Sequence, residues 1–443
     1  MRTFLPALLL MLTVSSAGLA AADTLRPAEA IRIGLLNNFD VRIQRNADST
    51  AINNRGLGQA GFLPTLDASA AAELSNSDQE ANVSFRGGVS DVTSFNAQLA
   101  LNWTLFDGFR MFINNRRYEQ LEILSRQRTR DLLENQAVAI LQQYYQAVSQ
   151  RALLDVARES RAISEARLER EKVRNDLGGI TSSQLYNAEV SYNNDRSLVL
   201  ERELSLAVAK KELNILLGRA PETEFYVADP ASPQPLNESL EQVLNAARER
   251  NSQLTLARQT IALAERDIEL AQAAFYPRLA LNASYAWSDR STTTDNPLPF
   301  PGASNTEELT SLDSRVSLNL SYNLFNGFRD QIAQQNAEIE RNNAMLELEK
   351  TQIRIEGLVR ELYLTYVKRL ELVELEEGNL SAAQRYLDIQ EERNRLGLST
   401  SLEFRDAQIN IVNVQNTLIT ARFQALISRA RLEQMLGRIS VDQ

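Results

Sequence analysis

The sequence predicts a mixed α and β membrane protein, in which three copies share a twelve-stranded β-barrel, four strands per chain, continued by long α-helices with coiled-coil spacing. Three observations predict this class. The 443 residues contain two similar halves, each half has two segments of alternating apolar and polar residues, and each half continues into a very long helical stretch. Alternation with a period of two is typical of strands, whereas apolar residues three or four apart are typical of helices.

The first 22 residues have the composition of a secretory signal peptide. Arg2 precedes an apolar stretch at 5–14, and the alanines at 20–22 form an A-x-A cleavage site before Asp23. The alternative is a retained anchor helix, which the short apolar run disfavours because a membrane helix needs about 20 apolar residues. We therefore expect residues 1–22 to be removed during export.

The residue types that the sequence lacks exclude several kinds of site. The chain has no cysteine, hence no disulfide or lipid-modified cysteine, and no histidine, the commonest general base and metal ligand. The net charge of -10 disfavours binding to nucleic acid. We found no phosphate loop or GxSxG motif. We expect no enzyme activity, no cofactor, no metal site and no nucleic-acid partner.

The two halves of the chain are related by a nearly constant offset in residue number. The sequence LFDGFR at 105–110 returns as LFNGFR at 324–329, an offset of 219, and the same offset relates Gly218 to Gly437. The offset between Pro64 and Pro277 is 213, so the difference of six falls between the proline and the LFxGFR motif. The predicted units are a first repeat at 23–219, a proline-rich linker at 220–237, a second repeat at 238–438 and a C-terminal tail at 439–443.

Each repeat contains two segments that alternate like strands. In the last of the four, Val316, Leu318 and Leu320 share one face, whereas Ser317 and Asn319 share the other. The segments are about nine residues long or a little longer, as tilted membrane strands require. A small soluble antiparallel sheet is the alternative. We predict β-hairpins at 66–106 and 279–325.

Two features suit a membrane hairpin. The connecting loops at 75–95 and 288–315 are long and polar, as loops on the extracellular side of a barrel are. The only tryptophans, Trp103 and Trp287, lie on the apolar faces toward opposite ends of the strand pattern, and we predict both as membrane-interface aromatics. Four strands cannot close a barrel, and an open sheet edge is not tolerated in lipid. A conducting width favours three chains over two, because side chains fill an eight-stranded barrel.

The patterns of the remaining segments predict helices. Helical stretches at 28–61 and 238–275 end near the prolines, and the stretch at 109–176 contains neither proline nor glycine over about 100 Å of helix. A turn rich in Gly, Ser and Thr follows each long stretch, because Gly suits a helix C-terminus and Ser or Thr an N-terminus. We predict long helical hairpins at 109–217 and 328–436.

The LFxGFR motif, the duplication and the Gly-rich hairpin turns together make the chain similar to the TolC family of outer-membrane efflux and export proteins over residues 23–438. The resemblance implies a homotrimer in the outer-membrane lipid of a Gram-negative cell, extending into the periplasm. It implies two further partners, a periplasmic adaptor (membrane fusion) protein and an inner-membrane transporter. It also implies a small equatorial region built from the linker and the C-terminal segment.

The resemblance carries two sites onto this sequence. Hairpin-tip residues that contact the adaptor match Gly178, Ile180, Thr181, Gly397, Leu398, Ser399 and Thr400. Acidic residues that narrow the periplasmic mouth match Glu403 and Asp406, and three chains would place them in rings of negative charge. The alternative is that both are solvated acids favoured by the positive end of a helix. Arg405 lies between them and is a possible ion-pair partner for either.

The exported cargo has two interpretations. The resemblance implies a passive duct for small toxic compounds, and the alternative is the outer-membrane component of type I protein secretion. Two other classes explain less of the sequence. A soluble periplasmic coiled-coil scaffold leaves the alternating segments unexplained, and a trimeric surface adhesin leaves the long internal duplication without a role.

Overall fold

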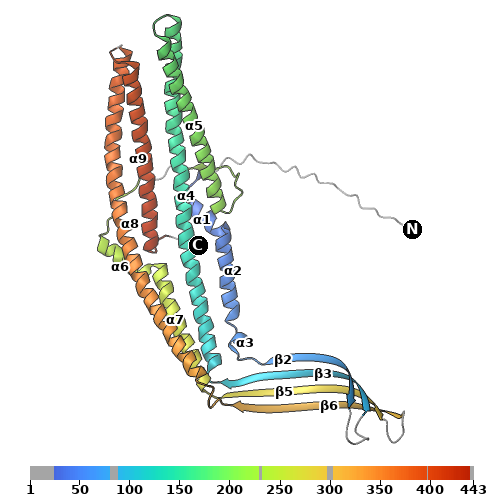
Figure 1. Cartoon of the computed structure of the whole chain (residues 1–443). Helices are drawn as coiled ribbons and strands as arrows, with labels where there is room; N and C mark the ends of the chain where they lie inside the picture. The colour runs from blue at the N-terminus through green and yellow to red at the C-terminus, as the bar shows by residue number, and fades with distance from the viewer. Residues whose placement is uncertain (1–23, 80–87, 229–231, 297–302, 397, 440–443) are drawn as a thin grey trace, which may run out of the picture.

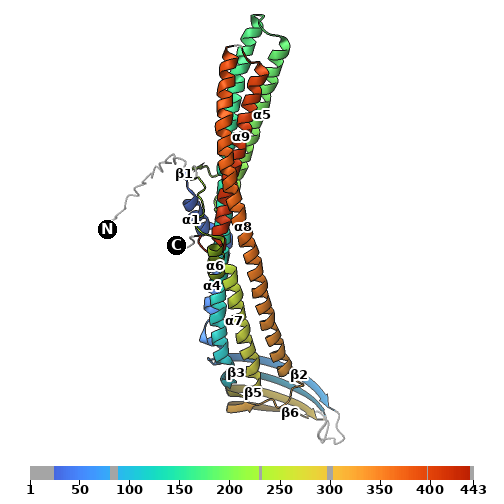
Figure 2. The ribbon, with the colours of Figure 1, turned by 90° about the vertical axis from the view of Figure 1, so that its left-hand side faces the viewer.

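The computed structural model describes residues 24–79, 88–228, 232–296, 303–396 and 398–439, so the predicted signal peptide lies outside the described ranges. A four-stranded sheet lies at one end of the molecule and the tips of two helical hairpins lie at the other (Figure 1). Shorter elements gather around the middle (Figure 2). Within the described part of the chain, no helix is both long and apolar enough to cross a membrane.

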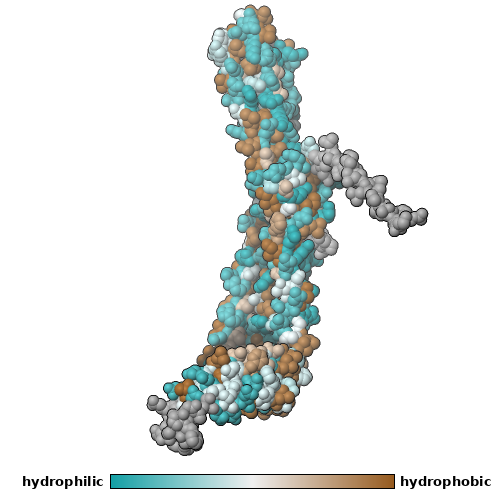
Figure 3. Space-filling view, turned by 90° about the vertical axis from the view of Figure 1, so that its right-hand side faces the viewer, coloured by the Kyte–Doolittle hydropathy of each residue, from teal (hydrophilic) through white to brown (hydrophobic). Residues whose placement is uncertain are grey.

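Two helical hairpins, one per repeat, form the long axis. The first helix of each hairpin has 67 residues, about 100 Å, and the second has 35. Figure 3 shows hydrophilic and hydrophobic side chains interspersed along one face of this helical part. The helices are α4 (Arg110–Asp176), α5 (Ser182–Leu216), α8 (Arg329–Arg395) and α9 (Ser401–Met435).

The LFxGFR motif makes the sharp corner between sheet and long helix. Phe109 and Phe328 stand directly before the helices with φ of 69° and 65°, in the left-handed region. Gly108 precedes Phe109 with φ of 71°, and a Cβ there would lie 2.4 Å from the Ala273 carbonyl oxygen. Only glycine fits this close approach. The motif therefore fixes the angle at which the strand leads into the helix.

The sheet is antiparallel throughout, in the order β2-β3-β5-β6. The strands have 15 to 20 residues, so the prediction of segments near nine residues was wrong. Much of the predicted loops at 75–95 and 288–315 continues the strands, because a ladder of backbone hydrogen bonds does not need alternating apolar side chains. Residues 80–87 and 297–302 lie outside the described residues. The strands are β2 (Thr65–Gln79), β3 (Gly88–Asp107), β5 (Arg278–Asn296) and β6 (Ala303–Ser321).

The register gathers the apolar residues of the four strands on one face. Trp103 pairs with Leu281, and Trp287 pairs with Ala97 on one side and Leu312 on the other. Since cross-strand partners point to the same side of a sheet, both tryptophans lie on this apolar face. The opposite face carries polar side chains. Within the described chain, β2 and β6 are edge strands that pair on one side only.

Each predicted N-terminal helical stretch of a repeat is broken, so the predictions of single stretches at 28–61 and 238–275 were wrong. Asn38 and Asn251 stand at the two breaks, and each side-chain oxygen accepts hydrogen bonds from two backbone N–H groups of the following helix. The pieces are α1 (Pro27–Asn37), α2 (Phe39–Asn54) and α3 (Leu57–Ala60), then α6 (Leu240–Arg250), α7 (Ser252–Gln272) and a 3₁₀ turn at Ala273–Phe275.

The two asparagines also hold the end of the last helix in their own repeat. The Asn38 amide donates to the Leu216 carbonyl at 3.1 Å, and the Asn251 amide donates to the Met435 carbonyl at 3.1 Å. Both side chains are buried. A kinked helix here is favoured because the buried amide satisfies groups at two helix ends at once.

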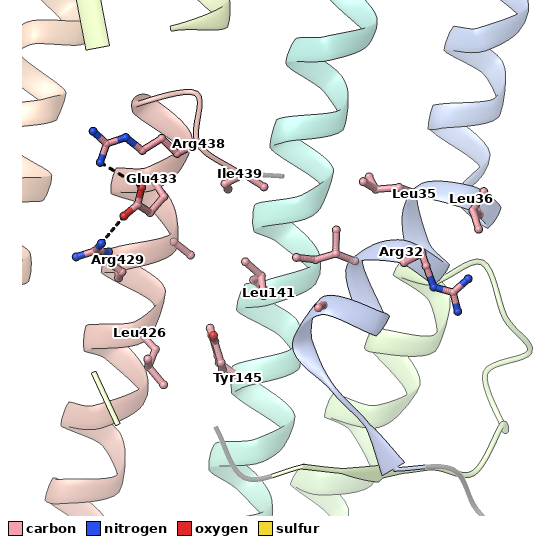
Figure 4. A pocket seen from close by; sticks show the side chains of 13 residues that line it. Arg32, Leu35, Leu36, Leu141, Tyr145, Leu426, Arg429, Glu433, Arg438 and Ile439 are labelled. Carbon is pink, nitrogen blue, oxygen red and sulfur yellow. Dashed lines mark ion pairs between the residues drawn. The ribbon is translucent and has the colours of Figure 1, made fainter. Parts of the chain in front are cut away.

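A belt of short elements lies beside α4 at mid-length (Figure 2). The parallel strands β1 (Thr24–Leu25) and β4 (Tyr226–Val227) form a two-stranded sheet, and the Tyr144 hydroxyl lies 2.9 Å from the Leu25 carbonyl oxygen. A cavity of about 710 Å³ opens between α1, α4 and α9 (Figure 4). Its charged rim includes Glu433, which forms ion pairs with Arg429 and Arg438.

Candidate functional site

The first hairpin tip joins α4 to α5 with few side-chain contacts. Gly178 has φ of 71°, and nothing lies within 4 Å of where its Cβ would be. Thr181 caps α5 in a reciprocal box, in which the Thr181 N–H donates to the Gln184 side chain at 3.1 Å. Ile180 is half-buried, whereas the neighbouring Leu177, which sequence reasoning did not single out, is 80% exposed. At this tip the glycine turn at Gly178 and the large apolar side chain of Leu177 are therefore exposed to solvent.

The second tip joins α8 to α9 and is tied more firmly. The Ser399 hydroxyl donates to the Gln390 side chain at 3.1 Å, and the Asn394 amide donates to the Ser399 carbonyl at 3.3 Å. Leu398 is 66% exposed and points its apolar surface to solvent. Gly397 lies outside the described residues. Both tips therefore present an exposed leucine beside a polar turn, at the end of the molecule farthest from the sheet (Figure 1).

Glu403 takes part in the cap of α9. Its carboxylate accepts from the Thr400 backbone N–H at 2.8 Å, and its own N–H donates to the Thr400 hydroxyl at 3.2 Å. The bonds that the Thr400 backbone N–H and hydroxyl donate to the carboxylate hold the pKa of the Glu403 carboxyl below its ordinary value, because they favour the charged form. Gln184 fills the same place in the first repeat. The position thus has a local role that is independent of any pore.

Asp406 lies one turn further along α9. Both Glu403 and Asp406 are exposed in the single chain, and the Glu403 carboxylate is already bound by Thr400. Three residues apart on a helix, the two residues occupy neighbouring positions of one face.

Arg405 pairs with neither neighbouring acid, which corrects the ion pair considered from the sequence. Its guanidinium donates two hydrogen bonds to the Asp195 carboxylate on α5, at 2.9 and 3.0 Å. The two side chains are only 15% and 9% exposed. The Ser160 hydroxyl on α4 donates to the same carboxylate at 3.3 Å. This cluster joins the helical hairpins of the two repeats just behind their tips.

Asp195 is the residue that sequence reasoning missed. It is far from Arg405 in the sequence, and the offset of 219 places no acidic residue opposite it in the second repeat. Its only local signal is an acid within a long polar helix, which most often means a solvated face. Only the packing of the two hairpins against each other brings Asp195 and Arg405 together.

The two tryptophans that the sequence analysis predicts as membrane-interface aromatics lie on the apolar face of the sheet. The Trp103 indole N–H donates to the Phe62 carbonyl at 3.0 Å, and the Trp287 ring lies 5.7 Å from the Phe95 ring. Leu281, the partner of Trp103, is six residues from Trp287 along β5. Six residues of strand span about 20 Å along the strand, or about 14 Å of height at a tilt of about 45°, so both tryptophans fit within the apolar band of about 25 Å.

Comparison with known proteins shows which family shares this architecture. The family model described as outer membrane efflux protein matches twice, over residues 30–219 and 243–438. The alkaline protease secretion protein AprF of Pseudomonas aeruginosa is 23% identical over 92% of this chain and 85% of its own. The outer membrane protein TolC of Escherichia coli is 24% identical over 99% of this chain and 87% of its own.

A solved structure shares the fold. The CmeC outer membrane channel of Campylobacter jejuni superposes with a TM-score of 0.75 at 15% sequence identity, covering 93% of this chain and 85% of that one. At this identity the likeness shows the fold alone. The mixed α and β fold class predicted from the sequence is confirmed.

Proposed function

The chain belongs to the outer membrane efflux protein family, and from that premise we propose that three copies form one outer-membrane channel continued by a helical duct into the periplasm. The observation that supports this proposal is the four-stranded sheet with its open edges. Four strands with one continuous apolar face and two open edges cannot stand alone in lipid, because unpaired edge groups cost several kcal/mol each. Three such sheets supply twelve strands, the polar face lines the pore, and the tryptophans lie at the two membrane interfaces.

The units of the chain follow the two repeats. Residues 1–22 act as the export signal, repeats 23–219 and 238–438 each supply one β-hairpin and one helical hairpin, and 220–237 contributes to the belt. A helix of about 100 Å carries the duct well away from the membrane. The family consists of transporters rather than enzymes, so the chain acts as a passive conduit. An inner-membrane transporter supplies the energy.

The hairpin tips dock the periplasmic adaptor. The positions are Gly178, Ile180 and Thr181 in the first tip and Gly397, Leu398, Ser399 and Thr400 in the second. An exposed leucine beside a capped turn offers an apolar anchor and free polar groups, the combination that binding hot spots use. The firmer second tip is the stronger contact, because fewer degrees of freedom are lost when a rigid turn binds.

The periplasmic mouth is gated by Glu403 and Asp406. Three chains place six carboxylates near the axis, a ring that selects and holds cations. The Thr400 bonds that cap α9 also keep Glu403 ionised, so capping and gating do not conflict. The buried Arg405–Asp195 pair holds the acidic helix against the neighbouring hairpin. The proposed gate therefore combines two acidic residues with an ion pair that holds their helix against the other hairpin.

The cargo is proposed to be small toxic compounds, as the family description of efflux favours. One observation favours the second candidate, type I protein secretion, since a relative covering 92% of this chain is a protease secretion protein. A deletion strain complemented with the wild-type gene separates the two. Restored growth on a panel of dyes, detergents and antibiotics supports small-molecule efflux. A restored secreted protein with unchanged drug sensitivity supports secretion instead.

A further inference from the structure

The two open edges of the sheet carry complementary charges on the polar face. Glu73 lies on this face of β2, whereas Arg315 and Asp313 lie on the same face of β6. Glu73 and Arg315 are exposed, and no ion pair between described residues includes either of them. In the proposed trimer, β6 of one chain pairs with β2 of the next, so these charges affect the register of that pairing.

The strand register within one chain shows which residues of β2 and β6 lie in the same row across the sheet. Backbone pairing connects Asp67 to Ala100, Ala100 to Ser284 and Ser284 to Arg315, so Asp67 and Arg315 end one row across the sheet. In a closed barrel of tilted strands such a row does not return to its own start. Arg315 must therefore face a residue of the next chain that is displaced along β2 from Asp67.

Geometry allows only two displacements. The displacement must be even, because an odd step would turn every polar side chain of β2 toward lipid. Four strands about 4.8 Å apart with a rise of about 3.4 Å per residue give a tilt of about 35° for four residues and about 47° for six. Barrel strands tilt by about 35–45°. Displacements of two and eight residues would need about 20° and about 55°, each about 10° or more outside this range, whereas the 47° for six residues exceeds its upper end by only about 2°.

The direction of the displacement is fixed by the strand ends. β2 begins at Thr65, so a shift of four or more residues the other way would leave residues 314–321 of β6 without a partner. That stretch includes the apolar residues Val316, Leu318 and Leu320. Unpaired backbone in lipid is not tolerated. The displacement therefore runs toward higher residue numbers in β2.

Charge decides between four residues and six. A shift of four sets Asp313 directly opposite Glu73 and Arg315 opposite Ala71, which brings like charges together. A shift of six sets Arg315 opposite Glu73, and Asp313 opposite Ser75. The outer face agrees, because alanines at 68, 70 and 72 then face Leu320, Leu318 and Val316, a pairing of small with large side chains.

We infer that β6 of each chain pairs antiparallel with β2 of a second copy in the register that sets Arg315 opposite Glu73. Three such ion pairs close the three seams on the pore side. This inference rests on the proposed trimer and adds the register and the residues that specify it. The seam is the place where assembly must choose one pairing among several, and opposite charges at one position disfavour the slipped alternatives.

Paired cysteines test the register, because the chain has no cysteine of its own. Directly opposed residues have Cα atoms about 4.5–5.5 Å apart, within reach of a disulfide, whereas diagonal neighbours lie at about 7–8 Å. The test variant carries Glu73→Cys with Arg315→Cys. Two matched controls carry Glu73→Cys with Asp313→Cys, for the shift of four, and Ser75→Cys with Arg315→Cys, for the shift of eight.

Oxidation in isolated outer membranes, followed by a non-reducing gel, should give a ladder ending at three chains. The test pair should cross-link about tenfold more than either control, since disulfide geometry is narrow. A control pair that cross-links best would overturn the register but keep the trimer. A ladder that ends at two or four chains would overturn the trimer itself. A protein that migrates as a trimer without cross-linking in any pair would overturn the seam.

A charge exchange tests the ion pair independently of the cysteines. Glu73→Arg should lower the temperature at which the trimer dissociates in detergent, because two arginines then face each other at each seam. Adding Arg315→Glu in the same chain should restore most of that loss. Failure of the second substitution to restore it would contradict the pairing of these two residues.

Discussion

The guanidinium of Arg405 donates two hydrogen bonds to the carboxylate of Asp195, a residue of the other repeat, at 2.9 and 3.0 Å. The pair is mostly buried, and Arg405 stands between the two acidic residues of α9 in the sequence. A paired, hydrogen-bonded charge is tolerated in such a place, whereas a single one left behind is strongly unfavourable. The two helical hairpins of a chain are therefore coupled at the end where the channel is proposed to open.

The first prediction concerns this coupling. Arg405→Ala and Asp195→Ala should each destabilise the contact between the two helical hairpins by about 3 kcal/mol, because each leaves an unpaired buried charge. Single-channel conductance in planar bilayers should rise as the hairpins separate. The exchange Arg405→Asp with Asp195→Arg is the control and should restore much of the closed behaviour. Equal conductance in all variants would show that the pair does not restrain the mouth.

The second prediction separates charge from capping at the gate. Alanine at Glu403 would remove both, but Glu403→Gln keeps the cap, since Gln184 caps α5 in the same way. Glu403→Gln with Asp406→Asn should raise conductance and weaken the preference for cations, because the ring loses its fixed charges and the ions they hold. Unchanged conductance would remove the two acids as the gate.

The third prediction is a pH dependence. The Thr400 backbone N–H and hydroxyl lower the pKa of Glu403 from its ordinary value of 4.5, so the capping contribution is complete above that value and is lost as pH falls through the lowered pKa. In an Asp406→Asn background, conductance should change as pH falls through the lowered pKa of Glu403. Thr400→Val, which lacks the hydroxyl, should move the midpoint upward. An unchanged midpoint in the Thr400→Val protein would contradict the assignment.

The fourth prediction concerns the second hairpin tip. Leu398→Asp should abolish export while trimers remain intact, because it places a charge on the proposed apolar anchor. Gly397→Asp, or a bulky residue at Thr400, should act in the same way. Leu398→Met keeps the apolar surface and serves as the control. Export assays and heat-resistant trimers on gels are the two readouts, and loss of the trimer itself would mean that the tip is structural.

The fifth prediction concerns the kinked helices of the belt. Asn251→Ala should destabilise the chain by about 2 kcal/mol, because a helix cap and a buried hydrogen bond to the Met435 carbonyl are both lost. Asn251→Asp keeps the capping oxygen but loses the donor and buries a carboxylate against the Met435 carbonyl oxygen, so it should cost at least as much. Asn38→Ala should match Asn251→Ala. The dissociation temperature of the trimer measures each effect, and a silent Asn251→Ala would show that the kink needs no amide.

Much of the architecture could be predicted from the sequence because it repeats. The constant offset between the repeats identified the corners at Phe109 and Phe328 and the hairpin turns, since local chemistry determines both. The kinks at Asn38 and Asn251 were missed, although their spacing equals that of Pro64 and Pro277. An asparagine within a helical pattern is a weak signal, and the break is stabilised by a helix end that is distant in the sequence.

In the candidate site, too, features set by neighbouring residues could be predicted, whereas features set by the packing of distant segments could not. Caps at Thr181 and Thr400 follow from a few neighbouring residues, so sequence alone located both tips. The ion pair between Asp195 and Arg405 depends on the packing of two hairpins, and no local pattern records it. The strands exceeded their predicted length because alternation reports only the part that faces lipid, whereas backbone pairing continues beyond it.

Native mass spectrometry of the complex extracted from the outer membrane in mild detergent tests the central claim most directly. If each chain contributes four strands to one conducting barrel of twelve, the intact particle contains three copies. A particle of three chains, each lacking its first 22 residues, is the expected result. A stable particle of one chain would contradict the shared barrel, and a stable particle of two chains would contradict the twelve-stranded pore and the duct built on it.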